Sequence, residues 1–290
     1  MTRPPAAAPL TFTLDLERHR PDDPRRYADN AARILDFFAA RGVRMTVFVV
    51  GELVGELAAL IRHAHADGHE FALHSYTHVP LTAEDPAFYG ARLAACRMQL
   101  EDLTGARVHG FRAPVFSLTP AATWVTGLLA EQGFSYSSSV LPAPHPLYGY
   151  PQAPMTPFRW PSGLLELPVP LLRLGPLHLP FLGGIYLRYL PHALIARARR
   201  ALAPEVAAWS YVHPYDIDSD EGYVRFPGAG AALSVLLWRR RAVTFKRLAG
   251  LLDASDGQAA PPFAKRLAQS GIVDAASFAP TPAGAAMPIQ

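Results

Sequence analysis

Two short polar motifs in this chain combine residue types that bind metal ions and move protons. His74-Ser-Tyr-Thr-His78 holds two imidazoles four residues apart, and on a helical turn these would lie on one face, close enough to share an ion. Asp15-Leu-Glu17 holds two carboxylates, and residues i and i+2 of a strand share a face. Two imidazoles and one carboxylate suit Zn²⁺ or another borderline divalent ion, and the second carboxylate can take a proton from a metal-activated water.

Arg112 and His213 extend this set of candidate residues. An arginine beside Asp15 would lower the pKa of that carboxyl group and orient it. His213 ends an apolar run, and an imidazole there can protonate a leaving amine as a general acid. Each of these residues alone is more often structural than catalytic, so the prediction depends on their meeting in one place.

The elements that would position these residues follow from hydrophobic periodicity. Short apolar runs alternate with amphipathic segments that end at glycines such as Gly42, Gly68 and Gly133, a pattern typical of βαβ units. We expect strands over 10–16, 45–50, 70–74, 108–112, 134–137, 164–168, 207–212 and 242–245, and helices over 27–41, 53–67, 86–103, 120–132, 191–202 and 231–240.

This order of elements predicts a closed or nearly closed barrel of parallel strands wrapped by helices. An open doubly wound sheet is the alternative, but no Gly-x-Gly-x-x-Gly follows the first strand, and no phosphate loop is present. Active sites of parallel barrels lie at the C-terminal strand ends, where the polar motifs fall. We expect one catalytic domain over 1–254, followed by a loosely held Ala/Pro-rich tail over 255–290.

Composition narrows the class of protein further. The chain has 290 residues, of which 50% are hydrophobic and 18% charged, with a net charge of +3; this is a globular composition. The single cysteine, Cys96, excludes an internal disulfide or a thiolate metal cluster. No stretch reads as a signal peptide or an integral membrane segment. We therefore predict a cytoplasmic protein with no nucleic-acid partner; the sequence does not indicate an oligomeric state.

The polar motifs also resemble, in order, those of the NodB-type polysaccharide deacetylases (carbohydrate esterase family four). The similar segments span roughly 10–250 and include Phe111-Arg-Ala-Pro114 and Val212-His213-Pro214. The resemblance implies a distorted (β/α)₇ TIM-like barrel in a single domain. It also implies roles: Asp15 as catalytic base, Arg112 orienting it and His213 as acid; Glu17, His74 and His78 as metal ligands; and the backbone N–H near Val115 at the oxyanion.

Three positions depart from the family's pattern. The usual adjacent Asp-Asp is here Asp15-Leu-Glu17, and Val115 replaces an aromatic residue. Ser137 stands where the Asp that partners the catalytic His is expected, and Asp216 is the candidate substitute.

The function expected from these observations is hydrolysis, with a divalent metal such as Zn²⁺, of an N-acetyl or N-formyl group on an amino sugar. The sugar would be part of a polysaccharide, a lipid-linked glycan or a nucleotide-linked glycan, and Tyr148 and Tyr186, in an irregular segment, are candidates to face it. Two alternatives stay open: a metal-independent amide or ureide hydrolase of the same fold, and a catalytically degenerate barrel that binds glycan without cutting it.

Overall fold

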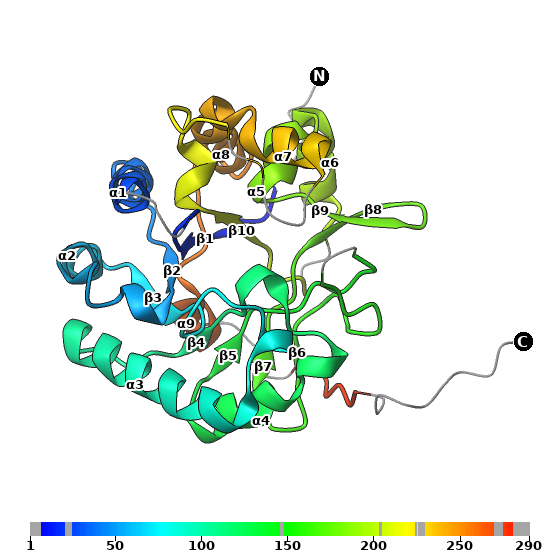
Figure 1. Cartoon of the computed structure of the whole chain (residues 1–290). Helices are drawn as coiled ribbons and strands as arrows, with labels where there is room; N and C mark the ends of the chain where they lie inside the picture. The colour runs from blue at the N-terminus through cyan, green and yellow to red at the C-terminus, as the bar shows by residue number, and fades with distance from the viewer. Residues whose placement is uncertain are drawn as a thin grey trace, which may run out of the picture.

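A curled sheet forms the centre of the molecule (Figure 1). The computed structural model describes residues 7–20, 25–145, 148–202, 205–223, 225, 230–269 and 275–280. In this part of the chain the sheet order is β10-β1-β2-β3-β4-β5-β7-β6, and all neighbouring strands pair in parallel except β6 and β7. The strands are β1 (Thr11–Leu16), β2 (Thr46–Val49), β3 (Glu70–Leu73), β4 (Gly110–Phe111), β5 (Tyr136–Ser137), β6 (Phe158–Arg159), β7 (Leu165–Glu166) and β10 (Trp209–Val212).

Both faces of this sheet are buried, which is why its strands read as near-continuous apolar runs. Val47 and Val49 of β2 pack into a core under the outer helices, whereas Phe48 between them belongs to a second core inside the curl. In β1 the alternation sends Leu14 outward to the helices. This arrangement, with parallel strands covered by helices, confirms the distorted (β/α)₇ barrel in a single domain.

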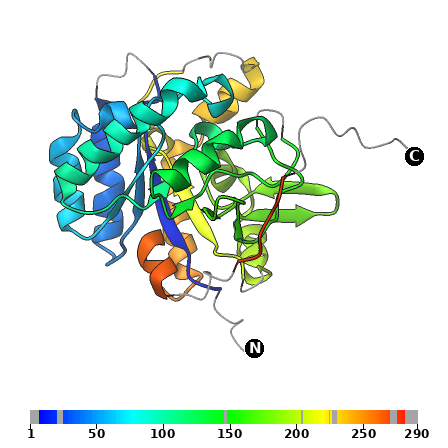
Figure 2. The same ribbon diagram turned by 90° about the horizontal axis from the view of Figure 1, so that it is seen from below.

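Helices cover the outside of the curl, with α1 to α4 along one side and α5 to α8 grouped on another (Figure 1). A hairpin of β8 (Leu171–Leu174) and β9 (Leu177–Pro180) projects from the barrel in both views (Figures 1 and 2). The helices are α1 (Arg26–Ala39), α2 (Ala58–Ala66), α3 (Pro86–Thr104), α4 (Trp124–Glu131), α5 (Gly184–Tyr189), α6 (His192–Arg200), α7 (Ala231–Trp238), α8 (Thr244–Asp253) and α9 (Phe263–Gln269). The short 3₁₀ turns are η1 (Gly51–Leu53), η2 (Leu81–Ala83), η3 (Pro114–Phe116), η4 (Pro120–Ala122), η5 (Pro214–Ile217) and η6 (Arg241–Val243).

One predicted strand is wrong, because residues 242–245 lie in η6 and the first turn of α8. The buried residues of α8 are Thr244, Leu248, Leu251 and Leu252, and this spacing of four and three gives one apolar helical face. The period becomes visible only when the window extends past residue 245, so the short apolar run alone was misleading.

The expectation of a loosely held tail does not hold for the segment that contains α9. Phe263 is fully buried, its N–H donates to Thr46 Oγ1 at 2.9 Å, and the N–H of Ala264 donates to Glu70 Oε2 at 3.1 Å. Thr46 and Glu70 begin β2 and β3, so α9 closes the N-terminal end of the barrel, opposite the predicted site. The domain boundary at 254 stays a prediction, and the last ten residues lie outside the described part.

Within the described ranges, no helix combines the length and the apolar character that a membrane span requires.

Candidate active site

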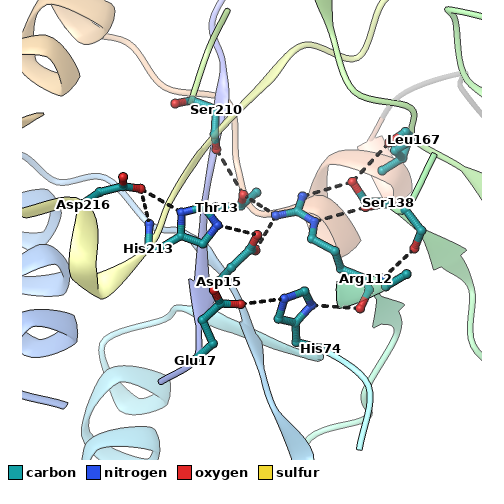
Figure 3. A network of polar contacts seen from close by, with 12 residues as sticks. Thr13, Asp15, Glu17, His74, Arg112, Ser138, Leu167, Ser210, His213 and Asp216 are labelled. Atoms are coloured by element: carbon teal, nitrogen blue, oxygen red, sulfur yellow. Dashed lines mark hydrogen bonds and ion pairs between the residues drawn. The ribbon is translucent and has the colours of Figure 1, made fainter. Parts of the chain in front are cut away.

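Polar side chains converge where β1, β3, β4 and β10 end (Figure 3). Asp15 lies in β1, and the other residues directly follow strands: Glu17 after β1, His74 after β3, Arg112 after β4 and His213 after β10. The first four are almost fully buried, and His213 has a side chain that is 15% exposed. The strand ends therefore bring together residues that lie up to 198 positions apart in the sequence.

Arg112 fixes the orientation of Asp15 from inside the barrel. Its Nη1 donates to Asp15 Oδ1 at 2.6 Å and to Thr13 Oγ1 at 2.8 Å. On the other side, Nε and Nη2 donate to the carbonyl and the hydroxyl of Ser138 at 3.1 and 3.0 Å. The guanidinium lies 4.0 Å from the ring centroid of Phe48 and 4.3 Å from that of Trp209. Burial lowers the pKa of Arg112 and the Asp15 carboxylate opposes this, so the side chain stays a cation.

Glu17, His74 and His78 form a cluster with the donor set of a metal site. Their ligand atoms lie within 4.8 Å of one another, with Glu17 Oε2 at 3.1 Å from His74 Nε2 and 2.5 Å from His78 Nε2. Tetrahedral Zn²⁺ sites with bonds of about 2.0–2.1 Å place ligand atoms about 3.3 Å apart. The cluster therefore has the compactness of an ion-binding site.

Hydrogen bonding of His74 supports the fit to a cation. His74 Nδ1 lies 2.9 Å from the carbonyl oxygen of Arg112, which can only accept, so Nδ1 carries a proton. In the neutral imidazole, Nε2 then presents a lone pair to the Glu17 carboxylate, and two facing acceptors are favourable only with a cation or a proton between them. The buried donor set thus fits a divalent ion.

Electrostatics inside the cluster act in the same direction. Burial alone raises the pKa of Glu17, but the charge of His78 and the hydrogen bonds of both imidazoles lower it well below its usual value. Burial lowers the pKa of His78, and the Glu17 carboxylate raises it above the usual value. Glu17 is therefore an ionised carboxylate, as a metal ligand must be.

The two imidazoles meet without a helix, contrary to the helical turn expected for His-x-x-x-His. Residues 76–78 form a bend, and Ser75 before them has a left-handed φ of 64°. The carbonyl of Ser75 accepts the N–H of Gly51 at 3.0 Å, and a Cβ at Gly51 would lie 2.5 Å from Cys96 Sγ. The left-handed residue stops a helix from forming, yet the bend brings the ring centroids of His74 and His78 to 5.2 Å.

His213 faces Asp15 and takes its hydrogen-bond partner from its own turn. Its Nε2 lies 3.7 Å from Asp15 Oδ2, and its Nδ1 lies 2.8 Å from Asp216 Oδ2. Burial lowers the pKa of His213, but the charge and hydrogen bond of Asp216, then Glu17 and Asp15, raise it to about 9. Ser137, at the position where an Asp was expected, instead donates to Ser139 Oγ at 2.8 Å. Asp216 thus occupies the partner role considered for it.

The three residues suggested for substrate contact differ in position. Val115 lies in η3, four residues after the end of β4, with φ 48° and ψ 28°. Its N–H donates no hydrogen bond within the described residues. The hydroxyl of Tyr186 lies 3.5 Å from His145 Nε2, and Tyr186 is close enough to Tyr211 to act on its pKa. Tyr148 is half-buried, and no contact between it and the site is found in the described part.

Several residues of the site were not identified from the sequence. Tyr215 stacks on His213 with ring centroids 4.7 Å apart and planes at 8°, and His19 also stacks on Tyr215, with ring centroids 4.3 Å apart. Thr13 and Ser138 hold Arg112. The position of Thr13, two residues before Asp15 on the same strand face, was the available signal; the contact of His19 comes from a loop whose path the sequence does not indicate.

The fold and the site together define a parallel α/β barrel with a candidate metal triad beside the pair of Asp15 and His213. The model of the polysaccharide deacetylase family matches residues 20–130, and that of a domain of unknown function (DUF3473) matches residues 138–259. Residues 20–130 thus match the polysaccharide deacetylase family, which confirms the resemblance found in the motifs of the chain.

Individual relatives agree with this assignment. A peptidoglycan deacetylase-like protein of Gibberella zeae is 32% identical over 97 residues, which are 33% of this chain and 28% of that protein. The match thus spans less than a third of the curated relative.

Solved structures show the shared fold. A Pseudomonas aeruginosa protein described as a polysaccharide deacetylase has a TM-score of 0.55 at 17% identity, covering 91% of this chain and 89% of the other. A Mycobacterium smegmatis protein with the same description has a TM-score of 0.52 at 22% identity, and the match covers 90% of this chain and 95% of the other. Puue allantoinase has a TM-score of 0.54 at 17% identity, and the match covers 91% of this chain and 89% of the other.

Proposed function

We propose that the chain removes an N-acetyl or N-formyl group from an amino sugar by hydrolysis of the amide bond. The observation that carries this proposal is the 3.7 Å approach of Asp15 Oδ2 to His213 Nε2 beside the triad of Glu17, His74 and His78. A proton acceptor and a proton donor on either side of one reacting centre, next to a cation site, are what hydrolysis of an unreactive amide needs. The match of residues 20–130 to the deacetylase family supports an acylated carbohydrate as the substrate.

The reaction that we propose assigns one proton to each member of the pair. As a water molecule adds to the acyl carbon, Asp15 accepts its proton, with the carboxylate held in place by Arg112. When the C–N bond breaks, protonated His213 donates its proton to the nitrogen, so that the products are a carboxylic acid and a free amine. The N–H of Val115, in the turn that follows β4 and without a partner in the described residues, would donate to the oxyanion.

We propose Zn²⁺ as the ion held by Glu17, His74 and His78, because mixed imidazole and carboxylate donors in a compact set suit it. Once bound, the ion would polarise the acyl carbonyl and increase the acidity of the attacking water.

The sugar substrate that we propose belongs to a polysaccharide, a lipid-linked glycan or a nucleotide-linked glycan. A cytoplasmic location, which the sequence analysis predicts, favours a small or carrier-linked precursor over a mature polymer. Assays with a short N-acetylated oligosaccharide and with a nucleotide-linked N-acetyl amino sugar separate these classes.

The experiment measures metal content and the release of acetate and formate for the wild type and for His74→Ala. Loss of His74 removes one of the three ligands, so we expect the variant to lose the bound metal and to release acyl groups at least about 100-fold more slowly. His63→Ala is the matched control, because His63 lies on α2 with a side chain that is 74% exposed, and we expect it to behave as the wild type.

Two outcomes would contradict the proposal. Acyl release by a metal-free His74→Ala variant at the wild-type rate would favour the metal-independent amide or ureide hydrolase. Sugar binding without any acyl release by the wild type would favour the degenerate glycan-binding barrel.

A further inference from the structure

The two carboxylate oxygens of Asp216 have different surroundings. Oδ2 accepts the backbone N–H of His213 at 3.0 Å and lies 2.8 Å from its Nδ1. Oδ1 is buried and accepts no hydrogen bond within the described residues. The charge facing Oδ1 belongs to Arg188, whose Nη2 lies 3.4 Å away. The ring of His213 is therefore fixed by a carboxylate whose second oxygen depends on one cation.

Arg188 is held firmly in this position. It lies in α5, and its side chain is 1% exposed. Its Nη1 donates to the carbonyl of Arg239 at 2.9 Å and its Nη2 to that of Leu237 at 3.0 Å. Both carbonyls are at the C-terminal end of α7, where unsatisfied carbonyls and the helix dipole favour a cation. The guanidinium is thus anchored on one side by backbone and meets the carboxylate on the other.

We infer that Arg188 is a positioning residue of the active site, which holds Asp216 so that Asp216 orients His213 as the proton donor. The inference rests on the proposed function, because a role for His213 as acid is part of it. It also gives a role to the segment matched by the domain of unknown function, residues 138–259. That segment contributes Arg188, His213 and Asp216, whereas the base and the metal triad come from the preceding part of the chain.

The physical argument is the unfavourable energy of a buried carboxylate with an unpaired oxygen. Without the cation, Asp216 can rotate or take up a proton, and either change removes the acceptor from His213 Nδ1. Burial raises the pKa of Asp216, while the charge and hydrogen bonds of His213, followed by the charge of Arg188, lower it. The other groups facing this pair are Asp15 and Glu17, the buried phenols of Tyr211 and Tyr215, and His78, which acts on His213. Besides His213 itself, Arg188 is the cation that acts on Asp216 within the described residues.

The alternative is that Arg188 only ties α5 to α7. Arg199 on α6 is a control that separates the two roles, because it is buried to the same degree but contacts no carboxylate in the described part. Its guanidinium donates to the carbonyls of Leu251 and Ala8 and to Ser255 Oγ. We compare Arg188→Gln, Arg188→Lys and the control Arg199→Gln in the full chain, measuring kcat, KM, Tm and the far-downfield proton resonance of a histidine Nδ1–H bound to a carboxylate.

We expect Arg188→Gln to lose that resonance and to reduce kcat by about 10- to 100-fold with little change in KM, as removal of a partner behind a functional group does. Arg188→Lys keeps a cation beside Asp216 and should restore both in part. Arg199→Gln should lower Tm while leaving kcat and the resonance unchanged. A variant Arg188→Gln that lowers Tm alone, with resonance and kcat of the wild type, would overturn the inference.

A double-mutant cycle covers the case in which Arg188→Gln folds poorly. In the background of Asp216→Asn, which has already lost the carboxylate, the added Arg188→Gln should reduce kcat by less than about twofold, because two residues that act through one contact are not additive. Full additivity would reject a role through Asp216. The resonance is measured without substrate. A wild type that releases no acyl group would therefore refute the proposed function, whereas the resonance of Arg188→Gln would still decide whether Arg188 positions Asp216.

Discussion

At the scale of single residues, the chemistry of His213 depends on a partner three positions away in the same turn. Asp216 Oδ2 accepts the backbone N–H of His213 and lies close to its Nδ1. His213 is the N-cap residue of η5, and the side chain of Asp216, three residues later in the same turn, holds it in a capping box. Such a local pair forms with little loss of chain entropy, because no distant strand has to supply the carboxylate. This explains how the site keeps a charged partner for His213 although Ser137 lacks a carboxylate.

The pH dependence of the reaction follows from this pair. His213 must be protonated to act as the acid, so activity should fall as the pH rises through its pKa of about 9. Asp216→Asn removes the main group that raises this pKa, while Asp15 and Glu17 remain. The alkaline limb of the kcat/KM profile should therefore move to lower pH by about one unit or more. Asp220→Asn, on the exposed side of the same loop, should leave the limb in place; a limb that also stays in place in Asp216→Asn would exclude this role of the pair.

The sequence indicates some of these residues better than others. Asp15 and Glu17 were recognisable because strand alternation and burial are local properties, and Thr13 follows the same rule. The contacts of Arg112 with Ser138 and the aromatic stack of Tyr215 on His213 depend on how separate strand ends approach each other. Residue spacing along the chain carries no information about that approach.

At the scale of elements, left-handed residues cluster in the turns that carry the site. Ser75 separates the two imidazole positions, and Val115 and Phe116 follow Arg112 by three and four residues, all with positive φ. Positive φ is unfavourable for a β-branched side chain and is found where surrounding structure imposes it. A strained Val115 whose N–H lacks a partner in the described residues is consistent with a backbone donor prepared for substrate.

Replacement of Val115 tests this interpretation. Val115→Gly removes the side chain that makes positive φ costly, about 1–2 kcal/mol, and roughly offsets the greater chain entropy of glycine. We expect the free energy of unfolding to stay unchanged or to rise, and acyl release to persist because the N–H remains. The matched change Val235→Gly within α7 should destabilise the protein by about 1 kcal/mol. A comparable loss at Val115, measured by denaturant unfolding, would contradict the assigned strain.

Element boundaries were predictable where periodicity is long and less so elsewhere. The helix expected over 86–103 is α3, Pro86–Thr104, because a proline after Asp85 and a glycine after the last turn mark both ends. The strands of the site are short, and β4 and β5 have two residues each. Such strands are specified by pairing with their neighbours rather than by their own composition.

At the scale of the whole molecule, the site is supported from beneath by the core inside the curl. Phe48 and Trp209 contact the guanidinium of Arg112 from below, and the same two rings lie 6.3 and 6.2 Å from the ring of Phe263. A chain of packed aromatic groups thus connects α9, at one end of the barrel, to the charged pair of Arg112 and Asp15 at the other. The composition of the C-terminal segment, rich in Ala and Pro, conceals this anchoring residue.

The anchoring role of Phe263 gives a prediction for the molecule as a whole. Phe263→Ala should open a cavity at the N-terminal end of the barrel and lower the free energy of unfolding by about 3–5 kcal/mol, as large-to-small changes in a core do. Phe88→Ala, on α3 with 63% of the residue exposed, is the control and should change it by less than about 0.5 kcal/mol. Denaturant unfolding of both variants decides between two views of the C-terminal segment. Equal stability would mean that α9 is loosely held, as its composition suggests; a selective loss would make α9 an integral part of the barrel, because the packing beneath Arg112 requires it.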